Sequence, residues 1–202
     1  PLAMIWAAMN IRLVFPNWKW PFKWLDQLEL FFTKYKKILA WVTLFYALIL
    51  GVYTGILFSA FNARPLWNTS ILGPLFLVSG LSTAAASIIL MSRNREERLL
   101  FAKIDLMLIG IELFLITHMF MGFLASTQVQ IDAAHMFLGG QFTAPFWVFV
   151  VGLGLVIPAL LEFLELIKIK IPVFVPAILV LMGGVVLRFI FANAGQLSRW
   201  LY

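Results

Sequence analysis

Five long apolar stretches constrain this chain more than any other feature. They occupy residues 38–61, 71–92, 101–125, 143–166 and 173–195. About 20 mostly apolar residues in a row let a helix cross the hydrocarbon core of a membrane. The stretches are too long for the roughly 10-residue strands of an outer-membrane barrel, and a backbone in lipid must satisfy its own hydrogen bonds. The sequence therefore predicts an all-α protein, a polytopic bundle of about five transmembrane helices.

The composition and the N-terminal region support this class. Hydrophobic residues make up 63% of the chain and charged residues 12%, against roughly 25% charged residues in soluble domains. We expect the bundle to cover residues 38–202 and a separate region to cover residues 1–37. Residues 1–15 lack the basic start and the cleavage site of a signal peptide, so we interpret them as the tail of a further span. The tryptophans and lysines that follow favour an amphipathic segment at the membrane surface.

Lysine and arginine residues gather on one side of the predicted bundle. They precede the first stretch, fill the turn between the second and third, and follow the fourth, whereas the opposite loops hold only Arg64 and Arg199. By the positive-inside rule the basic side is cytoplasmic, which places the loops 62–70 and 126–142 and the C-terminus outside. The net charge of +6 is thus a signal of topology. The basic residues never form the single stripe that is typical of nucleic-acid binding.

Metal-ligating side chains are scarce. The chain has no Cys, which excludes iron–sulfur clusters, thiolate metal sites and disulfides from it. Its two histidines, His118 and His135, fall in the third stretch and in a loop, so they are not placed as a pair that holds a haem between helices. We expect no tightly ligated redox metal here, and any electrons must be brought by a partner.

Ionisable residues within the predicted spans are the main candidates for chemistry. They are Asp105, Glu112, His118 and Arg188. Such a group costs roughly 2.5–3.5 kcal/mol on insertion scales and usually faces a cavity or a partner. Asp105 and Glu112 are about two helical turns apart on one face, which suits a proton path from the cytoplasm. A second explanation stays open, because Glu112 is also at a depth that allows an ion pair with Arg188. His118 lies roughly 120° around the helix from Glu112, which favours an interior histidine over a member of the acidic line.

Other acidic and small residues are interpreted as structural. Glu162 and Glu165 lie near the end of the fourth stretch, and we expect them in water at a helix end. The segment SGLSTAAAS, residues 79–87, predicts a packing seam because small residues let helices approach closely in lipid. The members of this seam are Gly80, Ala84 and Ser87. The same explanation fits the glycine pair at 183–184.

Four segments together resemble one family of membrane proteins. They are GVYTGILFSAFNARPLWNT, PLFLVSGLSTAAA, GLGLVIPALLE and LVLMGGVVLRFIFANAGQ, in this order along the chain. Over about residues 40–196 the chain is similar to the NrfD or polysulfide-reductase membrane subunit family. Members of that family typically have eight or more spans in two bundles. The resemblance therefore implies that the first few spans of the family are missing from this sequence.

The resemblance also implies a function. It predicts a quinone-reactive membrane subunit of a respiratory oxidoreductase, in a bacterial or archaeal cytoplasmic membrane. Such a subunit exchanges electrons between the quinone pool, menaquinone or ubiquinone, and an iron–sulfur partner that is itself bound to a molybdopterin or multihaem subunit. Coupling to proton translocation is left open. Two other functions also stay open: an ion channel or secondary transporter, and an anchor whose polar residues only pack.

A quinone site needs hydrogen-bonding side chains at the edge of the apolar region. The headgroup presents two carbonyl acceptors that become hydroxyl donors on reduction. We expect these side chains in the first stretch and in the loop after it, at Tyr53, Thr54, Arg64, Trp67 and Asn68. The alternative for Tyr53 and Trp67 is the aromatic belt at the membrane interface.

Overall fold

Every secondary-structure element in the described part of the chain is a helix. The computed structural model describes residues 4, 23–61, 63–169 and 171–199. The helices are α2 (Lys23–Lys34), α3 (Lys36–Ser59), α4 (Leu72–Met91), α5 (Arg95–Leu124), α6 (Gln128–Leu138), the π-helical η1 (Pro145–Val156), α7 (Ile157–Leu166) and α8 (Phe174–Leu197). The predicted all-α class is confirmed. The span tail predicted at residues 1–15 lies outside these ranges, apart from residue 4.

The chain forms two compact units, residues 1–50 and residues 51–202, and α3 runs across their boundary. The first unit contains α2 and the beginning of α3. Large apolar side chains of α2 are exposed, among them Trp24, Leu30 and Phe31. These side chains suit a surface segment, whose place at the membrane stays a prediction.

Helix length and composition make this a multi-pass membrane protein. In the described ranges, α3, α4, the continuous rod of η1 and α7 (Pro145–Leu166), and α8 are long and apolar enough to cross a membrane. These helices coincide with four of the five predicted stretches. The remaining stretch lies in α5, which is not among the four. Because α5 returns beside α4 after the short turn at residues 92–94, we infer that it recrosses the thickness that α4 crosses.

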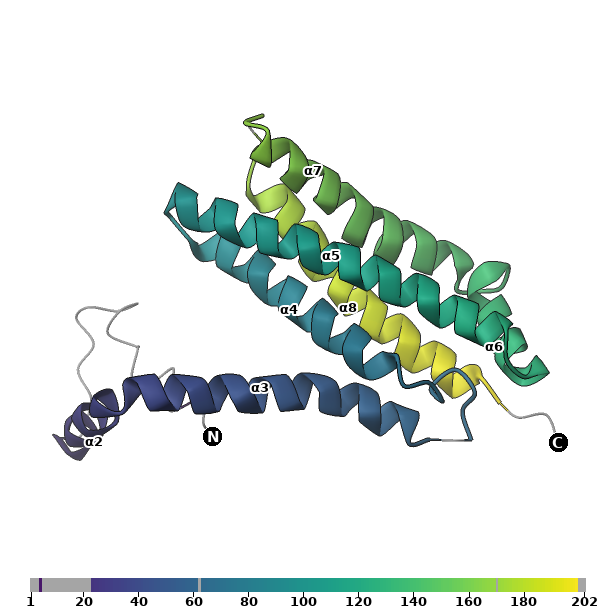
Figure 1. Ribbon diagram of the computed structural model, residues 1–202, viewed down its shortest axis with the longest axis horizontal. Coiled ribbons are helices and arrows are strands. Elements are labelled where there is room, and N and C mark those ends of the chain that lie inside the picture. The colour runs from purple at the N-terminus through teal and green to yellow at the C-terminus, as the bar shows by residue number, and fades with distance from the viewer. Residues whose placement is uncertain (1–3, 5–22, 62, 170, 200–202) are drawn as a thin grey trace. The chain divides into compact units, whose positions relative to one another are not determined.

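In the second unit, α4, α5, the η1–α7 rod and α8 form an antiparallel four-helix bundle. α4 contacts α5 and α8, and the rod contacts the same two helices, so the four helices close a ring. The α4–α5 and α7–α8 turns lie at one end of the bundle, and α6 lies at the other (Figure 1). We call the first end the basic end, because Arg93, Arg95, Arg98 and Lys168 lie there. We call the other the α6 end.

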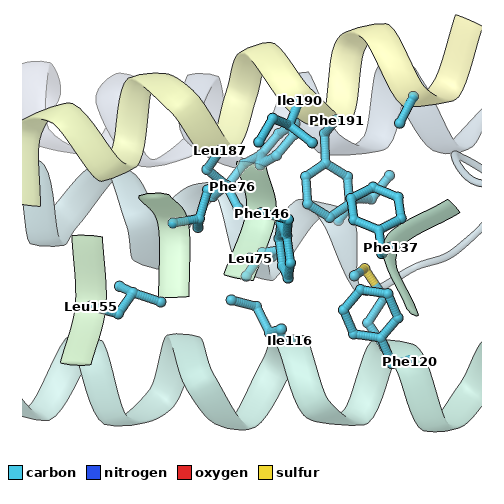
Figure 2. Packing of buried hydrophobic residues seen from close by; sticks show 14 of the residues in the cluster. Leu75, Phe76, Ile116, Phe120, Phe137, Phe146, Leu155, Leu187, Ile190 and Phe191 are labelled. Carbon is cyan, nitrogen blue, oxygen red and sulfur yellow. The ribbon is translucent and has the colours of Figure 1, made fainter. Parts of the chain in front are cut away.

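Aromatic packing fills the α6 end of the bundle (Figure 2). Phe137 of α6 has its ring centroid 5.1 Å from that of Phe146 in η1 and 5.6 Å from that of Phe191 in α8. Phe120 of α5 lies 5.6 Å from Phe146. Each such pair contributes about 0.5–1.5 kcal/mol beyond its buried area. The cluster therefore ties α5, α6, η1 and α8 together.

Two adjacent glycines bring α8 close to both of its neighbours. A Cβ built on Gly183 would lie 2.5 Å from the Cα of Gly154 in η1, so these two backbones touch. Gly184 faces α4, where its Cβ would lie 2.5 Å from the Cγ2 of Thr83. The packing explanation of the glycine pair is thus confirmed.

The packing seam predicted on α4 is wrong, because the buried face of the helix is made by other small residues than the three predicted. Ala84 is exposed, and Gly80 and Ser87 are only partly buried. The buried small residues of α4 are Gly73, Ser79, Ser82, Ala85 and Ala86. The inner face is fixed by where α5 and α8 lie against α4, and helical spacing alone does not show which of several small-residue faces that is.

Proline explains the change of pitch within the η1–α7 rod. Residues 145–156 are π-helical, and the N–H of Ile157 donates to the carbonyl of Gly152, five residues back. Pro158 has no N–H for the carbonyl of Gly154, and its ring would clash with that carbonyl in a regular α-helix. The wider turn relieves this clash. The helix then continues as α7, so the rod is not interrupted.

Candidate functional site

Six polar side chains from four helices lie inside the bundle, between its middle and the basic end. We call them the polar cluster: Ser79, Ser82, Asp105, Glu112, Glu162 and Arg188. All are buried except Arg188, which is partly buried. In the part of the chain that the structure describes, no three acidic or histidine side chains gather closely enough to hold a metal ion.

Asp105 and Glu162 face each other across the α5–α7 contact. Asp105 is 0% exposed, and the Oγ of Ser82 donates to its Oδ1 at 2.5 Å. The other oxygen of Asp105 and both oxygens of Glu162 have no hydrogen-bond partner among the described residues. The two carboxyl groups lie close enough to interact, and neither brings a donor while both are ionised. Two acidic groups therefore meet in the core with little compensation.

The prediction that Glu162 lies in water is wrong. Its side chain is 1% exposed, because α5 and α8 still cover the inner face of α7 at this depth. Glu165, by contrast, is partly exposed. One pattern in the sequence does indicate that Glu162 faces the bundle. Gly154, Pro158 and Glu162 follow one another at intervals of four residues, which places Glu162 on the same helix face as the glycine.

Glu112 lies deeper in the bundle, on the same inner face of α5 as Asp105, as predicted. Ser79 of α4 and Arg188 of α8 lie near it. The guanidinium Nη1 of Arg188 donates to the carbonyl of Gly184 at 2.7 Å. Within the described residues no ion pair joins Arg188 to Glu112, so the direct pair considered from the sequence is not formed. Gly184 has no side chain, which leaves room for the guanidinium to lie against the backbone of its own helix.

His118 lies outside the polar cluster. Its side chain is exposed, and its ring stacks on Phe114 with centroids 5.8 Å apart and an angle of 9°. The prediction that it does not extend the acidic line is confirmed. The prediction of an interior histidine is wrong, because the turn of α5 that carries it presents Ile116 and Phe120 to the core instead.

Trp67 anchors the loop between α3 and α4 to the end of α8. Its indole Nε1 donates to the carbonyl of Phe191 at 2.9 Å, and its ring lies 4.7 Å from that of Phe58. Gly195 of α8 lies so close to the indole that any Cβ there would overlap it. With 8% exposure, Trp67 belongs to the core and not to an interfacial belt.

Arg64 holds the same loop through its charge. Its Nη1 donates to the carbonyls of Gln196 and Ser198, the latter at 3.0 Å. The last carbonyls of a helix lack partners within the helix, and the negative end of the helix dipole favours a cation there. Arg64 therefore caps α8.

The other three residues predicted to bind quinone lie on the surface of the structure. Tyr53 is 53% exposed. Gly51 and Gly55 mark the face of α3 that approaches α4, and Tyr53 lies roughly 200° around the helix from Gly51. Thr54 and Asn68 are also exposed. The five residues thus divide into two that hold the loop and three whose side chains are exposed, among which the hydroxyl of Thr54 donates to the carbonyl of Gly51.

Two cavities border α6 at the far end from the polar cluster. One, of about 510 Å³, is lined by residues that include Asp132 and His135. The other, of about 300 Å³, lies between α6 and the end of α8 and includes Asp132 and Arg199. Both place charged groups at the α6 end.

Comparison with known proteins identifies similar chains. The family described as "Polysulphide reductase, NrfD" matches residues 1–198. Protein NrfD of Escherichia coli (strain K12) is 34% identical over 165 residues, which cover 75% of this chain and 51% of that protein. The C subunit of polysulfide reductase from Wolinella succinogenes is 34% identical over 167 residues, which cover 77% of this chain and 52% of that subunit. The chain thus spans about half the length of the curated relatives that it matches. No solved structure gives a significant match.

Proposed function

The chain belongs to the NrfD (polysulphide reductase) family, and from this membership we propose that it is a quinone-reactive membrane subunit of a multi-subunit respiratory oxidoreductase. It would exchange electrons between menaquinone or ubiquinone and an iron–sulfur partner subunit, and through that partner with a molybdopterin or multihaem subunit. The observation that carries the proposal is the polar cluster. Buried ionisable groups within apolar helices mark proton and ion pathways, and quinone chemistry moves protons together with electrons.

The residues divide the work of such a reaction. Electrons come from the partner in this proposal, because the chain has no Cys and only two histidines. Protons pass along the inner face of α5, through Asp105 and Glu112, toward the middle of the bundle. Arg188, near Glu112, places a positive charge beside this path.

Tyr53, Thr54 and Asn68 are the proposed contacts for the quinone headgroup, since these residues are exposed. Arg64 and Trp67 are positioning residues in this proposal. They fix the loop that carries Asn68 against α8. A quinone approaching along the lipid would then meet hydrogen-bonding groups at the edge of the apolar helix α3.

Replacing Tyr53 by phenylalanine should lower quinone turnover while leaving assembly intact. A lost neutral hydrogen bond corresponds to about 0.5–1.5 kcal/mol, or roughly 2- to 12-fold, and loss of a proton donor adds to this. The measurement is quinol oxidation by the complex purified with its partner subunits. Tyr46→Phe is a matched control, because Tyr46 is another exposed tyrosine of α3. Equal turnover in both variants would remove Tyr53 from the quinone site.

The proposed orientation places the basic end in the cytoplasm and the α6 end outside, where the partner would dock beside Asp132 and Arg199. The absence of native Cys allows a direct test. Gln141→Cys should react with a membrane-impermeant maleimide in intact spheroplasts, and Arg93→Cys should react only after lysis. Both side chains are exposed. The opposite pattern would reverse the orientation.

A further inference from the structure

The side chains of Asp105 and Glu162 hold half of the buried polar atoms that lack a hydrogen-bond partner in the described ranges. Six buried side-chain nitrogen or oxygen atoms in the described ranges have no hydrogen-bond partner, and three of them belong to this pair. Both side chains are essentially inaccessible, with exposures of 0% and 1%. A buried polar group without a partner is costly, and a buried charge is more so. The pair therefore requires a donor that side chains do not supply.

No cation fills this role in the described structure. Ser82 of α4 donates only to Asp105. Glu165, one turn further along α7, is acidic as well. Among the described residues neither carboxyl group forms an ion pair with a lysine or arginine, and the buried Nε of Arg98, two turns from Asp105 toward the basic end, is itself unpaired. Glu112 lies two turns deeper on α5, near Arg188.

A proton satisfies both groups at once. One protonated carboxyl donates its O–H to an oxygen of the other, which removes one negative charge and provides the missing donor. The hydrogen bond from Ser82 favours the ionised form of Asp105, which leaves the proton on Glu162.

We propose that Asp105 and Glu162 form a proton-binding site, in which the two carboxyl groups hold one proton and Glu162 carries it. Glu162 lies about 6 Å from the end of α7, and Glu112 lies about 10 Å deeper than Asp105 along α5, both at a rise of 1.5 Å per residue. The site is therefore placed between the basic end and the middle of the bundle. It goes beyond the proposed quinone reaction and does not depend on it.

Carbodiimide labelling tests the site without any variant. Dicyclohexylcarbodiimide reacts with protonated carboxyl groups in apolar surroundings: the proton moves to a carbodiimide nitrogen, and the carboxyl oxygen bonds to the central carbon. The complex in native membranes is treated at neutral pH and its peptides are analysed by mass spectrometry. We expect the adduct on Glu162 and none on Glu165, the partly exposed glutamate of the same helix. Absence of label from Glu162, or equal labelling of Glu165, would overturn the proposal.

Two further experiments test whether the two carboxyl groups share the proton, or whether burial alone or a bound cation explains the labelling of Glu162. In Asp105→Asn the amide donates to Glu162 and the neighbouring charge is gone, so labelling of Glu162 should fall several-fold. Undiminished labelling would show that burial alone keeps the proton on Glu162, and the shared site would be wrong. Replacing choline by sodium at constant pH should leave labelling of the wild-type complex unchanged. Loss of label in sodium would identify a cation site instead.

Discussion

A Glu112→Gln variant is expected to assemble with its partners and to lose most of the charge separation that accompanies quinone turnover. Glutamine keeps the size of the side chain and its contacts near Ser79, and it removes the titrating group. General acid–base steps contribute typically about 10²- to 10⁴-fold. Turnover that depends on a proton delivered through Glu112 should therefore fall at least about a hundredfold. The measurement is membrane potential and quinone turnover in proteoliposomes that contain the whole complex.

The same variant separates a proton role from an ion pair. Breaking a buried pair costs about 3–5 kcal/mol, whereas Arg188 in this structure keeps its hydrogen bond to Gly184 when Glu112 becomes neutral. We expect thermal unfolding in detergent to change little, as in the control Glu165→Gln. A variant that assembles and still generates full membrane potential excludes the proton role. A large loss of stability that Arg188→Met restores would show that the two side chains pair in the membrane.

Leucine at position 183 is expected to prevent the four-helix bundle from assembling. Even a Cβ at Gly183 would meet the backbone of Gly154 at 2.5 Å, and a backbone atom cannot rotate away as a side-chain atom does. Overpacking typically costs about 1–3 kcal/mol where side chains can adjust. Here the η1–α7 rod must separate from α8 along its length, so the effect should exceed that range.

Yield and unfolding temperature of the detergent-solubilised protein measure this effect. Gly110→Leu is the matched control, because a Cβ on this exposed glycine of α5 meets nothing within 4 Å. Gly183→Ala should be intermediate. A Gly183→Leu variant as stable as the control would mean that the contact between η1 and α8 does not hold the bundle together.

Local patterns in the sequence were sufficient for the helices and for one face of α5. Apolar runs of membrane length locate the rods, and a spacing of about two turns places Asp105 and Glu112 on one buried face. The family resemblance, carried by the segments around residues 51–69 and 74–86, is confirmed by the family match. Each of these inferences depends on residues that are close together in the chain.

Features that depend on which helices become neighbours could not be predicted in this way. The position of Glu162 near a helix end predicts that it lies in water, yet two other helices cover it. The sequence predicts His118 in the interior, yet its side chain is exposed. Arg188 bonds to its own helix because Gly184 leaves space one turn away. The identity and spacing of residues along one helix do not show which other helices will pack against it, since this depends on segments that are far apart in the chain.

The contacts of the α3–α4 loop have a consequence for biogenesis. Trp67 and Arg64 bond to carbonyls that lie 124 and 132 residues later in the chain. Membrane proteins are synthesised from the N-terminus, so α4, α5 and the η1–α7 rod leave the ribosome while this loop still lacks its partners. Only the emergence of α8 closes the ring of helices. The surface proposed to receive the partner subunit therefore cannot form before α8 has been synthesised, and a product that ends before α8 cannot present it.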